Sequence, residues 1–454
     1  MTITYLSLDD YPSLLSILVS IVWIVFGTSR LKLNPFIVLL SASLLLGFLL
    51  KIPIIEILIL IKSGFLKIIE NIGLLIVFGT IIGVILEKSN GTIVIASVVL
   101  KYFSRLPLPF AVSIIGYIVS IPVFCDAAFV ILSRLNKTLA NQTKTPLVGL
   151  TVALSTGLFA PHVLIPPTPG PLAAASNLDL KNIFLLIAVG SIIGFVLILV
   201  GAFYGNYLLK RNKYERSEPN KNILNMQIVN DHPKLISAML PILLPIGLMS
   251  LGALVKFMLF KNLFLEFINL LTSPISALGV GLLFSLRLSK TKNKFFVIES
   301  FKIGIKQALP ILLITGMGGA LGSIIQTIPI KDFALHLTDF NTLGILIPFG
   351  IAALLKTAQG SSTVAIITTS SICFPLLPFL GLESDMGKVW TIMSLGVGSM
   401  TISHANDSYF WIVSQMGDLD VKTAYKTHTV GTLLQGVIGF GVVFFCYSLW
   451  TFLN

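Results

Sequence analysis

The chain has 454 residues and a net charge of +12, yet only 11% of its residues are charged and 55% are hydrophobic. A soluble domain carries about 25% charged residues, and the mean hydropathy here is +0.95, so an ordinary soluble fold is excluded. Because apolar runs recur along the whole length, the sequence predicts an all-α polytopic membrane protein. Most Lys and Arg residues lie in short loops, which orients a membrane protein and does not indicate a nucleic-acid partner.

The three cysteines stand in apolar surroundings without CxxC spacing, so neither a zinc site nor a disulfide framework is indicated. No metal or other cofactor is expected. The chain begins MTITYLSLDDYP, with two acids and no base, whereas a secretory signal needs a basic n-region. We therefore interpret this start as a first span whose N-terminus faces outward.

Apolar stretches that are long enough to span, or nearly so, follow along the chain, and about 12–14 transmembrane segments are predicted. They lie at 12–28, 35–50, 71–87, 91–104, 108–121, 146–160, 181–209, 234–258, 263–286, 301–328, 342–355, 388–402 and 430–453. The stretch 54–70 differs, because Glu56, Lys62, Lys67 and Glu70 make it amphipathic. An interfacial helix fits this stretch as well as a span does.

The two most polar loops, 210–222 and 287–294, are strongly basic and are therefore predicted to face the cytoplasm. Two spans lie between them, an even number, which agrees with that orientation. The first loop divides the chain into an N-terminal transmembrane half (1–209), a basic linker (210–233) and a C-terminal transmembrane half (234–454).

Each half carries two polar interruptions of its apolar pattern. They are IPVFCDAAF (121–129) and APHVLIPPTPGP (160–171) in the first half, then LKTAQGSSTVA (355–365) and SHANDSYFW (403–411) in the second. Interruptions at corresponding places in two halves point to the binding site of a transporter. The repeat is inferred from this layout alone, since the halves share no evident residue identity.

The first interruption contains Asp126, the only charged residue between Arg105 and Arg134, just after Pro122. An isolated acid in a membrane is a functional-site hypothesis by default. The alternative is a structural salt bridge to a distant Lys or Arg.

The second interruption is predicted to break the helix, because five prolines remove backbone donors: Pro161, Pro166, Pro167, Pro169 and Pro171. Broken backbone at membrane depth persists only when it is buried or lines a wet cavity. Thr168 and Gly170 then offer a hydroxyl and an accessible backbone at the start of a new helix. The alternative is a surface loop, although His162 is the only ionisable residue in this stretch.

The third interruption gathers polar side chains around a glycine: Gln359, Gly360, Ser361, Ser362 and Thr363. A hydroxyl-rich helix start suits an anion or a carboxylate, and Lys356 one turn upstream adds positive charge. We predict that this helix start and the one at 168–170 face one another and bind the substrate carboxylate. The alternatives are helix packing by small residues and an interfacial, snorkelling lysine.

The fourth interruption places His404, Asn406 and Asp407 within four positions. On a helix, His404 and Asp407 would share a face, with Ser408 beside them, and the group would line a polar cavity. Asn406 is a candidate for substrate binding. For proton coupling we favour Asp407 first and Asp126 second, with His404 as a relay. The alternative is that Asp407 only caps a broken helix.

The glycine-rich stretch TGMGGALG (315–322) imitates a nucleotide-binding loop, but it lies inside an apolar span with no preceding strand. Close helix packing is the better interpretation. The signatures HExxH, CxxC, Walker A and GxSxG are all absent.

The stretches LITGMGGALG, LFAPHVLIPPTPGP, AQGSSTVA and SHANDSYFW resemble those of the gluconate permease (GntP) family, gluconate:proton symporters of bacteria. The resemblance covers nearly the whole chain. It implies a fold of the ion-transporter superfamily, with two inverted repeats, re-entrant hairpins and broken helices. It also implies proton-driven uptake of gluconate or a related small hydroxy-, sugar- or amino-acid anion at the bacterial inner membrane. Substrate, protons and lipid are the implied partners, and a homo-oligomer is compatible with it.

Two positions depart from the family pattern. Asp126 stands where the family usually has Glu, and Thr168 stands where a PPHPGP motif would place His. If that His selects sugar acids or carries protons, then His162 or His404 has to take over its role and the substrate can differ.

Three alternatives stay open at this point. One is a sodium-coupled carboxylate carrier of the same superfamily. Another, from a different class, is an intramembrane hydrolase that uses Asp126 and Asp407 as a catalytic pair. A passive anion channel is disfavoured, because broken helices around a midplane site suit alternating access better.

Overall fold

The computed structural model describes residues 11–103, 105–210, 233–255, 263–288, 294–325, 327 and 344–453. All regular elements in this part of the chain are helices. The predicted outward N-terminus, the linker between 211 and 232, and the loop centre at 289–293 lie outside the described residues. The predicted orientation of the protein in the membrane therefore stays a prediction.

The helices follow the apolar runs closely. Their bounds are α1 (Tyr11–Ser29), α2 (Pro35–Leu49), α3 (Ile54–Lys88), α4 (Gly91–Tyr102), α5 (Leu108–Ser120), α6 (Cys125–Thr143), α7 (Leu147–Leu164), α8 (Pro169–Asn177), α9 (Ile183–Lys210), α10 (Leu235–Val255), α11 (Leu263–Leu271), α12 (Pro274–Leu286), α13 (Lys294–Ile325), α15 (Leu346–Gln359), α16 (Ser362–Cys373), α17 (Asp385–Gly398), α18 (Ser408–Met416), α19 (Val421–Ala424) and α20 (Val430–Leu453). Within the described residues, six helical stretches are long and apolar enough to cross a membrane, and six more apolar helices are shorter. The protein is an all-α, polytopic membrane protein, as predicted.

Helix α3 corrects one expectation. The amphipathic stretch 54–70 is not a separate interfacial helix, because it continues without a break into the next apolar run as one helix of 35 residues. Its inner face, with Ile57, Gly64 and Ile68, is buried against the rest of the protein. The charged residues that make the stretch amphipathic lie on the other faces of the same long helix.

The glycine-rich stretch 315–322 lies inside α13 and packs against α3, which confirms the helix-packing interpretation. A Cβ on Gly64 of α3 would overlap the carbonyl oxygen of Gly319, and a Cβ on Gly319 would lie 2.7 Å from the oxygen of Gly64. By contrast, a Cβ on Gly322 would meet no atom within 4 Å, because Gly322 borders a cavity of about 330 Å³ between α3, α8, α13 and α16. The backbones of α3 and α13 are thus in direct contact at Gly64 and Gly319. This contact is possible only because both residues are glycines.

This contrast leads to a stability prediction for two glycines three residues apart on the same helix. We expect Gly319→Ala to destabilise the protein by about 1–3 kcal/mol, because the backbone of α3 blocks the new methyl group. Gly322→Ala should be neutral or stabilising by about 0.5–1 kcal/mol, since alanine is the better helix former and space is free. Thermal unfolding of the two purified variants in detergent measures the difference. Equal shifts in Tm would contradict the packing described here.

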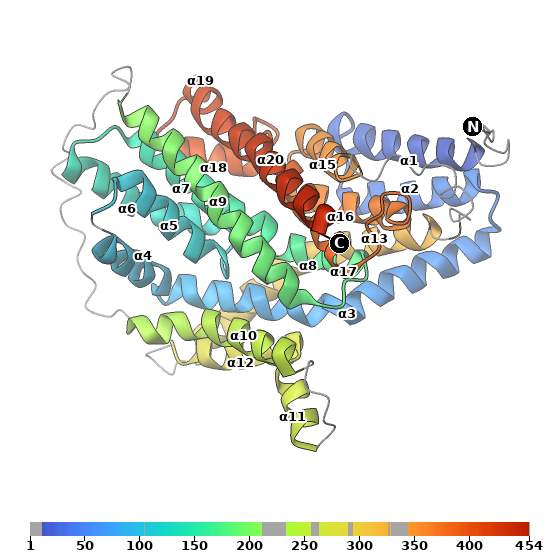
Figure 1. Ribbon diagram of the computed structural model, residues 1–454, viewed down its shortest axis with the longest axis horizontal. Helices are drawn as coiled ribbons and strands as arrows, with labels where there is room; N and C mark the ends of the chain where they lie inside the picture. The colour runs from blue at the N-terminus through green and yellow to red at the C-terminus, as the bar shows by residue number, and fades with distance from the viewer. Residues whose placement is uncertain are drawn as a thin grey trace.

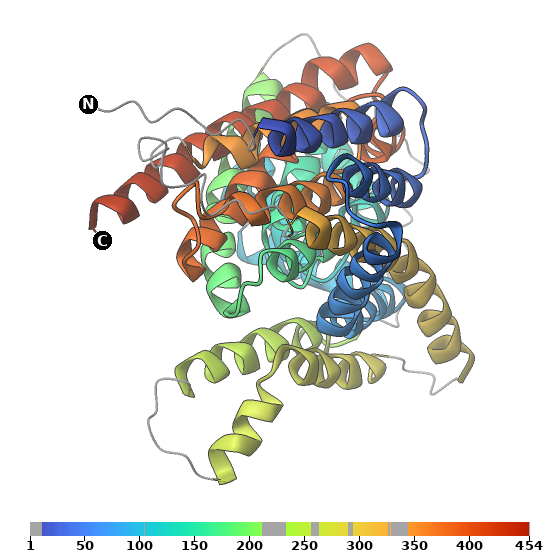
Figure 2. The same cartoon turned by 90° about the vertical axis from the view of Figure 1, so that its right-hand side faces the viewer.

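The two halves of the chain interlock around a buried core. Helices α3 and α13 pack along each other, α7 lies between α5 and α9, and α20 packs against both α9 and α17. Helix α7 is buried along nearly its whole length. Helices α10 and α12 form a layer on the outer side of α3, from which α11 projects (Figures 1 and 2). The polar interruptions of both halves come together inside this bundle.

Candidate functional site

The third interruption is a tight turn between two packed helices. Helix α15 ends at Gln359 and is followed by Gly360, whose φ of 85° lies in the left-handed region. A Cβ on Gly360 would overlap the carbonyl oxygen of Asn406. Ser361 caps α16 by accepting a hydrogen bond from the backbone N–H of Val364, at 3.3 Å. The predicted helix start is confirmed, and glycine is needed at position 360 both for its conformation and for the close approach of the fourth interruption.

The fourth interruption is not helical, so the prediction that His404 and Asp407 share a helical face is wrong. Helix α17 ends at Gly398 and α18 begins at Ser408. The reason is capping, because the Asp407 carboxylate accepts a hydrogen bond from the N–H of Tyr409 at 3.0 Å from an extended backbone conformation. The expected structural role of Asp407 is therefore present, together with a second role.

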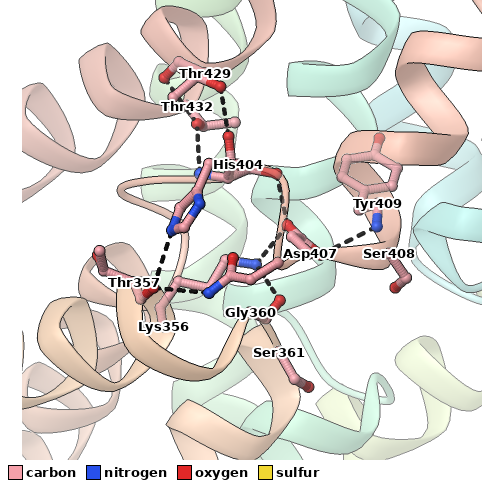
Figure 3. Close-up of polar contacts among 12 residues, drawn as sticks. Lys356, Thr357, Gly360, Ser361, His404, Asp407, Ser408, Tyr409, Thr429 and Thr432 are labelled. Carbon is pink, nitrogen blue, oxygen red and sulfur yellow. Dashed lines mark hydrogen bonds and ion pairs between the residues drawn. The ribbon is translucent and has the colours of Figure 1, made fainter. Parts of the chain in front are cut away.

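The second role is a buried ion pair with Lys356 (Figure 3). The Lys356 ammonium lies 2.6 Å from Asp407 Oδ2 and donates a further hydrogen bond to the carbonyl of Gly360 at 2.8 Å. Only 1% of Lys356 and 4% of Asp407 is exposed. The snorkelling alternative for Lys356 is thus wrong, because its charge is neutralised inside the protein, where burying it alone would be costly.

His404 and Asn406 hold the two interruptions of the second half together. His404 Nε2 donates to the carbonyl of Thr357 at 2.9 Å, and Asn406 Nδ2 donates to the same oxygen at 2.8 Å. Both side chains therefore bond the last turn of α15, as Figure 3 shows for His404. His404 makes no contact with Asp407 that would serve the relay predicted for it.

The structure adds two residues that the sequence reasoning missed. Ser403 Oγ lies 2.5 Å from Asp407 Oδ2, and His428 Nε2 lies 3.1 Å from Ser403 Oγ. On its other side, His428 Nδ1 lies 3.1 Å from Ser155 Oγ of α7. His428 belongs to a π-helical turn, Tyr425–Thr429, that leads into α20, and such turns recur at functional sites. In the sequence it stands between basic and hydroxyl residues, without any signal of burial.

The first interruption reaches this group from the opposite half. Helix α5 ends at Ser120 and α6 begins at Cys125, which places Asp126 in the first turn of α6. Ser408, the neighbour of Asp407, donates a hydrogen bond to Asp126 Oδ2 at 3.4 Å. Among the described residues Asp126 has no ion-pair partner, so the structural salt bridge considered for it is not found there.

The second interruption is shorter than predicted. Helix α7 passes through Pro161 and ends at Leu164, and α8 begins at Pro169. The prediction that no helix runs through Pro161 is wrong, because one missing N–H is tolerated where neighbouring helices bury the whole segment. Pro169 fits the first position of α8, where an N–H would have no partner anyway. The break is therefore limited to residues 165–168.

The predicted binding groups of this segment are placed as follows. The hydroxyl of Thr168 donates to the carbonyl of Ile165 at 2.5 Å, so it satisfies a backbone acceptor within the break between α7 and α8. Gly170 lies against α16, where a Cβ would come within 3.0 Å of Ile366, one turn beyond the start of that helix. His162 is buried beside the ring of Phe124, and its Nδ1 has no hydrogen-bond partner among the described residues.

Gln359 is left with the largest unused hydrogen-bonding capacity at the junction. Its Nε2 and Oε1 atoms are both buried without a partner among the described residues. It directly precedes Gly360, whereas Ser362 and Thr363 form the first turn of α16. Because buried polar groups are nearly always satisfied, an amide in this position is suited to a polar ligand.

Apolar helices that break around a buried ion pair define a membrane transport protein. The sequence matches the model of the GntP family permeases over residues 12–450, and the chain belongs to this family. It is a permease, and the alternative of an intramembrane hydrolase is wrong. In agreement, Asp126 and Asp407 are linked only through Ser408 and not to each other.

The chain is similar to several named transporters over nearly its full length. A permease of Haemophilus influenzae is 30% identical (94% of this chain, 90% of the relative). The gluconate permease of Zymomonas mobilis is 29% identical (93% and 95%), and the D-serine transporter DsdX of Escherichia coli is 27% identical (94% and 97%).

Two solved structures share the fold at low sequence identity. The YdaH transporter of Alcanivorax borkumensis has a TM-score of 0.59 and 14% identity (86% of this chain, 88% of that chain). MtrF of Neisseria gonorrhoeae has a TM-score of 0.61 and 16% identity (86% and 83%). Both are membrane transporters, which agrees with the predicted fold class.

Proposed function

We propose that the protein takes up a small hydroxy-acid anion, such as gluconate, into a bacterial cell across the inner membrane, together with protons. The observation that carries the proposal is the buried pair of Lys356 and Asp407 at the meeting point of the interruptions. Relatives named as gluconate permeases and as a D-serine transporter support a carboxylate as the common substrate feature.

The pair provides a mechanism of exchange. A substrate carboxylate that binds the Lys356 ammonium replaces the Asp407 carboxylate, and the free amide of Gln359 bonds the substrate's hydroxyl groups. Asp407 then lacks a countercharge, and an unpaired buried carboxylate is costly while it is ionised. It takes up a proton, so the loaded site has the same net charge as the empty one.

This balance ties one anion to one proton. Neither ligand alone leaves the site neutral, because the anion without the proton leaves a negative charge and the proton without the anion leaves a positive one. Moving an uncompensated charge through the membrane interior is strongly opposed. Asp126, in the first turn of α6 in the N-terminal half, is proposed to assist proton coupling as a second carboxylate, since it contacts Ser408 next to the pair.

Uptake by proteoliposomes tests this function. We expect an acid-outside pH gradient alone to drive accumulation of labelled gluconate, with glycerate, idonate and D-serine as competitors that rank the substrate preference. Because one anion moves with one proton, an imposed membrane potential should leave the rate unchanged. Accumulation driven only by a sodium gradient would replace this proposal with the sodium-coupled carrier, and downhill flux without accumulation would indicate a channel.

A further inference from the structure

We infer that His428 and Ser403 form a proton path to Asp407, a route that the known family membership does not assign. The inference rests on the proton coupling proposed above and names the residues that carry it. It begins with one unbroken row of polar atoms: His428 Nε2, Ser403 Oγ and Asp407 Oδ2, separated by 3.1 and 2.5 Å. Ser403 and His428 are fully buried.

The hydrogen atoms in this row can be counted. The hydroxyl of Ser155 lies 3.1 Å from the carbonyl of Val152 and 3.1 Å from His428 Nδ1. When it donates to the carbonyl, its oxygen accepts from His428 and Nδ1 carries a hydrogen; when it donates to Nδ1, the hydrogen of the neutral ring is on Nε2. Ser403 has a single hydroxyl hydrogen and two close neighbours, Asp407 and His428 Nε2. It can donate to only one of them at a time.

With a hydrogen on Nδ1, two arrangements satisfy both contacts of Ser403. In the first, Ser403 donates to an ionised Asp407 and accepts from a protonated Nε2, so His428 carries the extra proton. In the second, a protonated Asp407 donates to Ser403, and Ser403 donates to a neutral Nε2. Each arrangement holds one proton more than the pair of a neutral histidine and an ionised aspartate.

The two arrangements interconvert by a balanced transfer. The Nε2–H bond of His428 breaks as an O–H bond forms on Ser403, while the original O–H bond of Ser403 breaks as an O–H bond forms on Asp407 Oδ2. One proton leaves the histidine and one arrives at the aspartate, and no heavy atom has to move. When the substrate takes Lys356 away from Asp407, this transfer supplies the compensating proton.

The surroundings of His428 favour such a role. The charged and titratable groups near its ring are Asp407, Lys356 and Tyr409. Complete burial of the ring opposes a lasting positive charge on it, so a proton that reaches His428 is passed on rather than held. The hydroxyl of Tyr409 donates to the carbonyl of Ser155 at 2.8 Å and is not part of the row. His404, whose Nε2 is bonded to a backbone carbonyl, lies outside it as well.

The test compares His428→Gln with the wild type in proteoliposomes. Glutamine can keep a hydrogen bond to Ser403 but cannot carry a titrating proton. We expect His428→Gln to lower proton-driven uptake by about 100-fold, the typical contribution of a positioned proton-transfer group. Exchange of labelled for unlabelled substrate at equal pH, which needs no net proton movement, should remain close to that of the wild type, because Lys356 and Gln359, the groups proposed to bind the substrate, are unchanged.

Two serine variants keep the test decisive if glutamine disturbs folding. Ser403→Ala interrupts the row of polar atoms and should have the phenotype of His428→Gln. Ser285→Ala removes a buried hydroxyl that bonds the carbonyl of Leu282 within α12, away from the row, and should retain driven uptake. Wild-type-like driven uptake in His428→Gln or Ser403→Ala would overturn the inference, and so would a parallel loss of exchange in folded protein. If the wild type itself shows no proton-driven uptake, the proposed function fails rather than the path alone.

Discussion

Asp407→Asn is expected to abolish concentrative uptake while the protein still folds and exchanges substrate. Asparagine keeps one oxygen, which can cap α18 through the N–H of Tyr409, while its amide nitrogen takes the place of the Oδ2 atom that faces Lys356. Because this breaks the buried ion pair, we also expect a loss of stability of about 3–5 kcal/mol. It cannot alternate between a charged and a neutral form, so the site can no longer tie the anion to a proton. Accumulation of labelled substrate under an acid-outside gradient and exchange at equal pH, assayed on the same proteoliposomes, measure the two activities separately.

Asp418→Asn is the matched control for this change, because Asp418 forms an ion pair with Lys137 in which the aspartate side chain is 62% exposed. It should accumulate substrate like the wild type. Gradient-driven accumulation that survives in Asp407→Asn would end the coupling role of Asp407 and leave only its cap and its ion pair. Loss of both accumulation and exchange in folded protein would instead assign it to substrate binding.

Lys356→Met is expected to destabilise the protein strongly. It leaves the Asp407 carboxylate buried without its countercharge, and removing one partner of a buried ion pair costs about 3–5 kcal/mol. Substrate binding should be lost at the same time, because the proposed carboxylate ligand is gone. Chemical or thermal unfolding in detergent and a binding assay with labelled gluconate check the two effects independently.

The double variant Lys356→Met with Asp407→Asn separates stability from function. It removes both charges, so we expect it to recover most of the lost stability but no transport. The surface pair again provides the comparison, since Lys137→Met should cost less than about 1 kcal/mol at an exposed site. A single Lys356→Met variant that is as stable as the wild type would show that the pair is not buried from water as described.

The four interruptions could be predicted from the sequence because their causes are local. Proline restricts the backbone and removes a donor, and glycine permits left-handed conformations, in any surroundings. The breaks at 121–124, 165–168 and 360–361 therefore fall inside the predicted stretches. The errors arise where local rules compete. At Pro161 burial among neighbouring helices outweighed the missing donor, and at Asp407 the capping bond to Tyr409 outweighed the helical spacing of SHANDSYFW.

The sequence by itself determined that this chain is a membrane protein made of helices, and it indicated where those helices break. Hydropathy acts residue by residue, so it can be read without knowing any contact. Only the tertiary structure decided which polar groups meet. Lys356 and Asp407 are 51 positions apart and Ser155 and His428 are 273 apart, and each pair exists because distant helices pack in one particular way. A buried charge requires a partner, but the sequence does not say which one, because that choice belongs to the packing of the whole bundle.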